Sequence, residues 1–205
     1  FLSNLRTINV ANYTKRKLNY FPYISKTYNS VSGFNEDKLG AEVFLNTGTG
    51  KQINLTVNPD FGQAESDEVI VNFSAQETFY SEKRAFFNEN QSLFDLSHYD
   101  RYRVINTRRI GAASSYDCET SADEDSCNDV KKSYTDIDFA LRYTQKNDNN
   151  DIGIFVAQET DESFTKGKNF YAIRSKNMVG SRSIGYFLTH VVDNFTNEKA
   201  TVNVI

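Results

Sequence analysis

Residues 133–146 alternate between apolar and polar side chains, which is the pattern of a β-strand with two unlike faces. The pleat of a strand places every second side chain on the same side. We therefore predict that Asp138, Arg142 and, in a later strand, Arg174 face solvent or a water-filled lumen, opposite an apolar band. The predicted band comprises Ile137, Phe139, Leu141 and Tyr143, together with Ile184, Tyr186 and Leu188.

The same alternation recurs in other segments of strand length, joined by short polar connections such as Thr47-Gly48-Thr49-Gly50. Successive strands that are joined by short turns pair in antiparallel fashion. The sequence therefore predicts an all-β fold, an antiparallel up-and-down meander. Its strands are predicted at residues 18–28, 38–46, 52–58, 101–110, 133–146, 152–157, 169–176, 182–193 and 199–205.

The length of 205 residues suits one domain with a sizeable core, and we interpret residues 1–205 as a single domain, a fragment of a larger β-barrel domain. The net charge of -4 argues against a nucleic-acid partner. No apolar run reaches the roughly 18 residues of a membrane-spanning helix. A meander with one apolar face suits a soluble, half-exposed sheet or an outer-membrane-type β-barrel. Strands near the ~9–11 residues that cross a bilayer favour the barrel.

Residues 56–94 interrupt the meander with a stretch that reads as neither an ordinary strand nor an ordinary helix. It combines many acidic side chains with the basic pair Lys83 and Arg84 and with several aromatic rings. Charges at this density must lie in water or be paired with one another. We therefore predict an irregular, plug-like segment inside the barrel. The alternatives are a solvated surface loop, a pair of catalytic carboxylates and a calcium site.

The plug-like segment is expected to be held by ion pairs between its acids and the Arg-rich stretch that follows it, because a guanidinium group can give a carboxylate two hydrogen bonds. The predicted structural or binding network comprises Asp60, Gln63, Glu65, Asp67, Glu77, Glu82, Lys83, Arg84, Arg108 and Arg109. We assign no catalytic residue, metal ion or cofactor to it, although the acidic runs leave calcium open as a ligand.

The two cysteines, Cys118 and Cys127, flank an acidic loop. Their spacing fits no zinc pattern, and no histidine lies near them in the sequence. We predict a disulfide that closes this loop, which would indicate an oxidising compartment. Two free thiols are the alternative.

Two motifs give the chain a family resemblance. The first is NPDFGQAESD followed by VNFSAQETFYSEKRAFF, and the second is Arg-Arg-Ile-Gly at residues 108–111. The chain resembles bacterial outer-membrane proteins that pair an N-terminal, family-nine-type carbohydrate-binding-like domain with a large C-terminal domain of unknown function. The resemblance places this chain at the start of the C-terminal domain. It implies a β-barrel, location in the bacterial outer membrane, and outer-membrane lipid as a partner.

The resemblance implies no known reaction. Our first hypothesis is a segment of an outer-membrane β-barrel protein that serves glycan binding or uptake at the cell surface, with a glycan as its possible small partner. One alternative is a surface-associated glycoside hydrolase with paired carboxylates, and another is a soluble β-sheet binding module. The sequence leans towards a non-enzymatic role, because it contains neither a GxSxG nucleophile elbow nor an HExxH metal motif.

Overall fold

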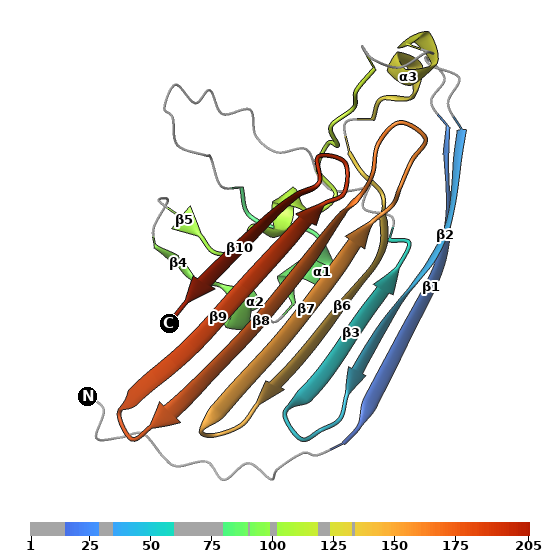
Figure 1. The fold of residues 1–205 in the computed structure, drawn as a ribbon. Helices are drawn as coiled ribbons and strands as arrows, with labels where there is room; N and C mark the ends of the chain where they lie inside the picture. The colour runs from blue at the N-terminus through green and yellow to red at the C-terminus, as the bar shows by residue number, and fades with distance from the viewer. Residues whose placement is uncertain are drawn as a thin grey trace, which may run out of the picture.

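Eight strands form one antiparallel sheet in the order β1-β2-β3-β6-β7-β8-β9-β10 (Figure 1). The computed structural model describes residues 15–28, 35–59, 80–89, 91–98, 102–118, 124–132 and 134–205. Strands that neighbour each other in the sheet also follow each other in the chain, so the predicted all-β meander is confirmed. The strands are β1 (Lys17–Tyr28), β2 (Asn35–Asn46), β3 (Lys51–Val57), β6 (Ile137–Lys146), β7 (Asn150–Glu159), β8 (Lys168–Val179), β9 (Arg182–Asp193) and β10 (Glu198–Val204).

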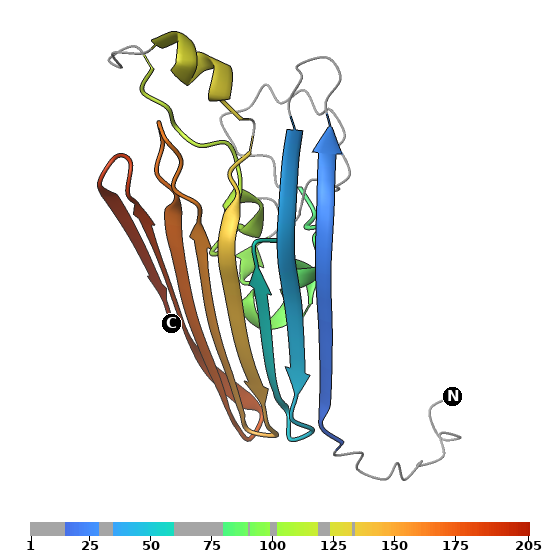
Figure 2. The ribbon, with the colours of Figure 1, turned by 90° about the vertical axis from the view of Figure 1, so that its right-hand side faces the viewer.

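The connection from β3 to β6 carries the remaining elements. They are α1 (Ala85–Asn88), α2 (Gln91–Phe94), β4 (Ser97–His98), β5 (Tyr102–Arg103), the 3-10 helix η2 (Thr107–Arg109) and α3 (Glu124–Val130). Figures 1 and 2 place α1 and α2 against one face of the sheet, whereas α3 lies beyond the end of the strands. We call the described residues 80–89, 91–98 and 102–112 the inner segment, and the sheet face that they cover the inner face.

The hydrophobic core lies between the inner face and the inner segment. Phe155 of β7 is its centre, with ring centroids 6.1 Å from Phe87 and 6.3 Å from Phe94. Phe94 also packs against Phe187 of β9, at 6.4 Å between centroids. Small residues at neighbouring inner positions, Ala140, Ala157 and Ala172, are fully buried and leave room for these rings. Two four-residue helices cannot be stable alone, so this packing is what fixes the inner segment.

The opposite side of the sheet, which we call the outer face, is also apolar. A row of paired residues crosses it from β1 to β9: Leu18, Leu45, Ile53, Tyr143, Ile154, Ile173 and Leu188. Many outer-face side chains are exposed, including Ile24 at 81%, Leu39 at 71% and Ile184 at 60%. β10 adds Lys199, Thr201 and Asn203 to this face, so the apolar rows end at β9. The described chain therefore covers one apolar face of the sheet and leaves the other open.

The predicted separation of side chains between the two faces is confirmed for most positions. Phe139, Leu141 and Tyr143 lie on the outer face with Ile184, Tyr186 and Leu188. Arg142 and Arg174 occupy inner-face positions, and Arg142 is 3% exposed.

Two predictions about strands are wrong. Ile137 does not join the outer apolar band, because the pairing of β6 with β7 shifts register between Ile137 and Phe139, and Ile137 enters the core. Residues 101–110 do not form a long strand. Where they are described they contain the two-residue β5 and the helix η2, and the chain turns there so that the carbonyl oxygens of Thr107 and Ile110 accept hydrogen bonds from Arg84.

Gly153 gives a test of how the inner segment packs on the sheet. A Cβ atom at this position would lie 2.6 Å from a ring atom of Phe94 and 2.8 Å from the Leu93 side chain. Gly153→Val should therefore lower the free energy of unfolding by about 1–3 kcal/mol through overpacking. Ile154→Leu, on the outer face of the same strand, is the matched control and should change it by less than about 0.5 kcal/mol. Equal denaturation midpoints for the two variants would contradict this packing.

Candidate functional site

The Glu82–Arg84 ion pair is the centre of the inner segment. Arg84 gives the carboxylate two side-chain hydrogen bonds, Nε to Oε1 and Nη2 to Oε2, both 2.8 Å long. The Thr107 hydroxyl donates a third bond to Oε2 at 2.7 Å. The Glu82 side chain is 1% exposed and that of Arg84 is 8% exposed, so the pair is shielded from water. Burial alone would raise the pKa of Glu82, but the bonds and charge of Arg84, with the Thr107 hydroxyl, outweigh it and hold the pKa below its usual value.

The same guanidinium joins the two sequence motifs. Arg84 donates from Nη1 to the carbonyl oxygen of Ile110 and from Nη2 to that of Thr107, each at 2.7 Å. The Glu-Lys-Arg run at 82–84 therefore recognises the backbone of the Arg-Arg-Ile-Gly turn. The Asn106 side chain caps this turn by accepting from the Arg108 backbone N–H. These bonds hold the turn by its main-chain atoms, so the Arg108 side chain can line the adjacent cavity.

Glu159, at the end of β7, attaches this turn to the sheet. Its carboxylate accepts the Gly111 backbone N–H at 2.8 Å and the Lys168 backbone N–H at 2.9 Å. Gly111 has a φ of 78°, a left-handed conformation that favours glycine. Glu159 itself is 3% exposed. Its two oxygens satisfy two backbone donors at the seam between the inner segment and the sheet.

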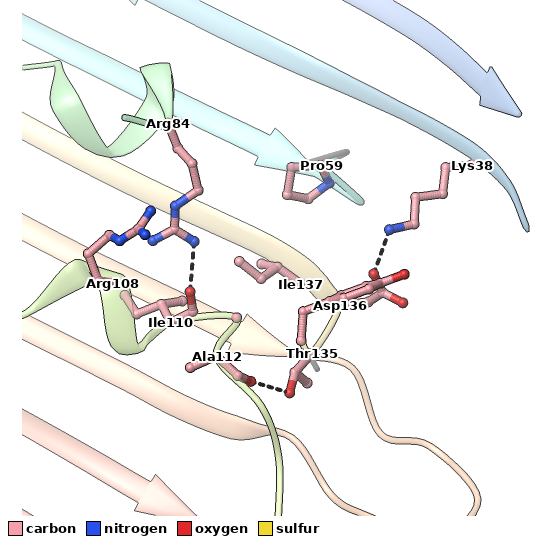
Figure 3. Close-up of a pocket in the computed structure, with 11 residues that line it drawn as sticks. Lys38, Pro59, Arg84, Arg108, Ile110, Ala112, Thr135, Asp136 and Ile137 are labelled. Atoms are coloured by element: carbon pink, nitrogen blue, oxygen red, sulfur yellow. Dashed lines mark hydrogen bonds and ion pairs between the residues drawn. The ribbon is translucent and has the colours of Figure 1, made fainter. Parts of the chain in front are cut away.

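A cavity of about 330 Å³ lies next to this turn, between the end of β3 and the start of β6 (Figure 3). β2 runs past the last residue of β3, because Ala41 pairs with Val57 and residues 35–40 pair only with β1. In Figure 3, Arg84 and Arg108 reach the cavity from the inner segment, and Lys38 reaches it from β2. The lining residues are Lys38, Pro59, Arg84, Arg108, Ile110, Gly111, Ala112, Tyr134, Thr135, Asp136 and Ile137.

One side of the cavity is built from a cluster of opposite charges. Asp136 accepts from Lys38 at 2.6 Å and from Lys132 at 3.1 Å, and Lys132 also reaches Glu162 at 2.9 Å. Burial would raise the pKa of Asp136, but the two lysines outweigh it and lower the pKa. Burial alone would lower the pKa of Lys132, but its carboxylate partners Glu162 and Asp136 outweigh it and raise the pKa. These contacts tie β2 to the loops before β6 and after β7.

Tyr134 stands at the edge of this charge cluster. Its hydroxyl donates to Glu36 at 3.1 Å, and the ammonium groups of Lys38 and Lys132 lie 5.4 and 5.7 Å from its ring centroid. Burial, followed by the Glu36 carboxylate, raises the pKa of Tyr134 to about 12. An aromatic ring beside cations and a carboxylate offers a ligand both a stacking face and hydrogen-bonding groups.

The structure describes only part of the predicted network. Asp60, Gln63, Glu65, Asp67 and Glu77 lie outside the described residues. Glu82 and Arg84 are brought together. Arg108 lines the cavity, Lys83 and Arg109 are exposed, and each of these three has an interaction partner. The wider network between these arginines and the acids of the central stretch stays a prediction.

The predicted disulfide is present. Cys118 and Cys127 are bonded, with 5.5 Å between their Cα atoms, and both residues are buried. The bond joins the chain before α3 to the middle of that helix, away from the cavity.

The described groups determine what chemistry the cavity can support. Asp136 is the one carboxylate among its described lining residues, whereas glycoside hydrolysis needs two carboxyl groups roughly 5 to 9.5 Å apart. Within the described ranges no group of three or more His, Cys, Asp and Glu could hold a metal ion. The helices described are also too short and too polar for any of them to cross a membrane. The described lining offers a polar ligand hydrogen-bonding groups and an aromatic ring.

Sequence reasoning missed Thr107, Glu159 and the cluster around Asp136. One contact of each spans a long sequence separation: Thr107 to Glu82 spans 25 residues, Gly111 to Glu159 spans 48 and Lys38 to Asp136 spans 98. No local pattern identifies such partners. The one available signal was that Glu159 ends an alternating strand at an inner-face, buried position, where an acid needs a partner.

Comparison with known proteins identifies one family. A family model described as a domain of unknown function (DUF5916) matches residues 14–204, which is nearly the whole chain. Neither the curated proteins nor the solved structures gave a match.

The Glu82–Arg84 pair gives a stability prediction. Glu82→Ala leaves the Arg84 charge uncompensated in a buried site and should cost about 3–5 kcal/mol of unfolding free energy. The exposed pair Lys26–Asp37, at 3.2 Å, is the matched control, and Asp37→Ala should cost no more than about 1 kcal/mol. Chemical denaturation of both variants measures the difference. Similar small losses would mean that Glu82 is solvated rather than buried.

The same pair should also make stability depend on pH. Because the pKa of Glu82 is lower when folded, its contribution is complete above the unfolded value of about 4.3 and is lost as pH falls through the folded value. The difference in stability between the wild type and Glu82→Gln should therefore shrink on acidification below about pH 4. A difference that stays constant from neutral pH down to acid unfolding would contradict the lowered pKa.

Tyr134 gives a spectroscopic prediction. Absorbance titration of the phenolates should show one tyrosine that ionises at about pH 12, well after an ordinary tyrosine at about 10. Tyr134→Phe should remove this late step. If Tyr134→Phe instead removes a step near the ordinary tyrosine pKa of about 10, burial and Glu36 do not raise the pKa of this ring.

Proposed function

We propose, for a chain that belongs to the domain family DUF5916, that its sheet forms part of the wall of a β-barrel in the bacterial outer membrane. The observation that carries the proposal is the open, apolar outer face. Monomeric soluble proteins rarely expose contiguous apolar patches beyond a few hundred Å². Here exposed apolar side chains extend over six strands. They are Leu18, Tyr20, Ile24, Tyr28, Leu39, Val57, Ile154, Tyr171, Ile173, Val179, Ile184 and Tyr186.

The inner face has the properties expected of a barrel interior that contains a plug. Polar side chains occupy it next to the aromatic core, including Asn54, Thr56, Arg142 and Thr144, all at most 3% exposed. In a soluble protein, a two-layer fold buries its apolar face and leaves the polar face in water. This sheet does the reverse, because its more polar face is covered by the inner segment and its more apolar face is open.

The connections between strands differ at the two ends of the sheet. One end has short turns at residues 47–50, 147–149 and 180–181, whereas the other end carries the connections 29–34, 58–136, 160–167 and 194–197 (Figure 1). Outer-membrane barrels have short turns on the periplasmic side and longer loops outside. Strand lengths of 7 to 12 residues also suit strands that cross a bilayer. Strands β1 and β10 form the sheet edges, where further strands of a larger barrel would pair.

Within this proposal, the cavity serves glycan binding or uptake at the cell surface. It lies towards the end with longer connections, and its volume of about 330 Å³ falls in the range of small-molecule sites. Lys38 and Arg108 bring hydrogen-bond donors to it, Asp136 brings acceptors, and Tyr134 brings an aromatic face. A sugar ring offers hydroxyl groups and apolar faces that match this combination.

Membrane partition of full-length protein tests the proposal. Ile173 lies in the long apolar row, and Ile173→Lys should reduce recovery in the membrane fraction and destabilise the protein in lipid vesicles by about 2–4 kcal/mol if it faces the bilayer centre. Asp148→Lys, in the short turn after β6, changes charge outside the apolar rows and should leave recovery unchanged. A wild-type protein that stays soluble without detergent would contradict the membrane proposal and favour a soluble binding module.

A further inference from the structure

Side-chain type changes along single rows of paired residues on the outer face. Paired residues of antiparallel strands lie opposite each other, so each row runs across the sheet at one level. One row near the end with the longer connections is apolar on β1, β2, β3 and β6 and mostly polar from β7 to β10. Its members in order are Pro22, Ala41, Val57, Phe139, Gln158, Asn169, Val192 and Lys199.

A second row, near the short turns, changes in the opposite direction. It pairs Lys51 of β3 with Gln145 of β6 and continues through Ile152 and Ser175 to Tyr186 of β9. In this row the strands that were apolar in the first row carry polar side chains. Polar residues therefore occupy two opposite corners of the outer face.

The corner at the end with the longer connections is the more polar of the two. We call Gln158, Asn169, His190, Lys199 and Thr201 the polar corner. Gln158, Lys199 and Thr201 are exposed, and Nδ1 of His190 lies 2.8 Å from Oγ1 of Thr201. Amide and ammonium groups are costly in contact with lipid hydrocarbon. A bilayer that contacts the outer face would therefore exclude this corner from its hydrocarbon core.

The exposed apolar side chains follow the other diagonal of the sheet. At the end with the longer connections they lie on β1 and β2, where Ile24 is paired with Leu39. At the end with the short turns they lie on β8 and β9, at Val179 and Ile184. The apolar band therefore crosses the strands obliquely rather than at a right angle.

We propose that lipid hydrocarbon contacts the outer face along an oblique belt, from residues 18–24 of β1 to residues 184–188 of β9, and that the polar corner lies outside the hydrocarbon. This inference rests on the proposed membrane function and specifies the surface that meets the lipid. The belt also explains why Lys199, Thr201 and Asn203 follow an apolar sheet: on β10 these positions lie beyond the border of the belt.

The slope of the belt gives the tilt of the strands. Leu188 lies in the same row as Leu18, so from Ile24 on β1 to Leu188 on β9 the border of the belt falls by six residues over six strand steps. At about 3.3 Å per residue and about 4.8 Å per strand, the strands tilt by roughly 35° from the bilayer normal. Outer-membrane barrels tilt their strands by ~35–45°, so a slope read from residue types agrees with that architecture.

Fluorescence quenching of full-length protein in lipid vesicles tests the belt. Single cysteines replace Val57, Phe139, Asn169 and Lys199 in turn, and each carries an NBD fluorophore, while the bonded Cys118 and Cys127 stay unlabelled. The four positions share one row, so each is the matched control for the others. Labels at 57 and 139 should be quenched by lipids with brominated acyl chains and not by aqueous iodide. Labels at 169 and 199 should show the reverse.

A second pair of positions repeats the comparison near the short turns. Asn150 and Ile184 share a row through Asn177, and there the label on β9 should contact acyl chains while the label on β7 contacts iodide. Acyl-chain quenching at every position would overturn the oblique belt and leave the membrane proposal intact. Iodide quenching at every position would overturn both.

Discussion

A pleated strand sends alternate side chains to opposite sides, and in this sheet both sides carry large apolar side chains. That constraint determines what the rest of the chain must do. The inner face is covered by Phe86, Phe87, Leu93 and Phe94 of the inner segment. The outer face, with apolar rows that run from β1 to β9, is not covered by any described part of the chain. An aqueous environment on that side would leave it exposed at considerable cost, whereas a lipid environment would not.

The inner segment depends on tertiary contacts, because it has little regular structure of its own. Its helices span four residues each, and its ladder β4–β5 has two residues per strand. The Phe cluster anchors it to the middle of the sheet, whereas Glu82, Arg84 and Glu159 fix its turn to the strand ends. Arg84 binds the carbonyl oxygens of Thr107 and Ile110 and so folds two distant motifs onto each other. The cavity lies beside this turn, where β2 runs past the end of β3.

The meander was predictable because apolar and polar residues alternate with the period of two that a β-strand requires. The predicted segments 182–193 and 133–146 fall on β9 and β6. As expected, Arg142 lies on the other face of the sheet from Leu141. Ile137 was misplaced because a register shift is invisible in a pattern of apolar and polar residues. Residues 101–110 were misread because Val104 and Ile105 suggest a strand, while the packing of the turn on Arg84 decides its shape.

The candidate site was less predictable than the fold. The motifs at 82–84 and 108–111 were recognised, and the structure shows why they belong together. Glu159, Thr107 and Asp136 were missed because one contact of each, to Gly111, Glu82 and Lys38 respectively, spans tens of residues and follows no spacing rule. The acidic residues from Asp60 to Glu77 lie outside the described part of the chain, so their predicted pairing with Arg108 and Arg109 stays a prediction.

Spin labels placed one by one along β6 and β8 of the full-length protein in lipid vesicles test the central claim most directly. Their accessibility to oxygen, which concentrates in lipid, is compared with accessibility to a water-soluble nickel reagent. The account predicts a period of two, in which labels at outer positions such as Leu141, Tyr143, Tyr171 and Ile173 contact oxygen but not nickel. Labels at the inner positions Ala140 and Ala172 should be shielded from both reagents. Nickel access at the outer positions would contradict the claim that this face meets lipid.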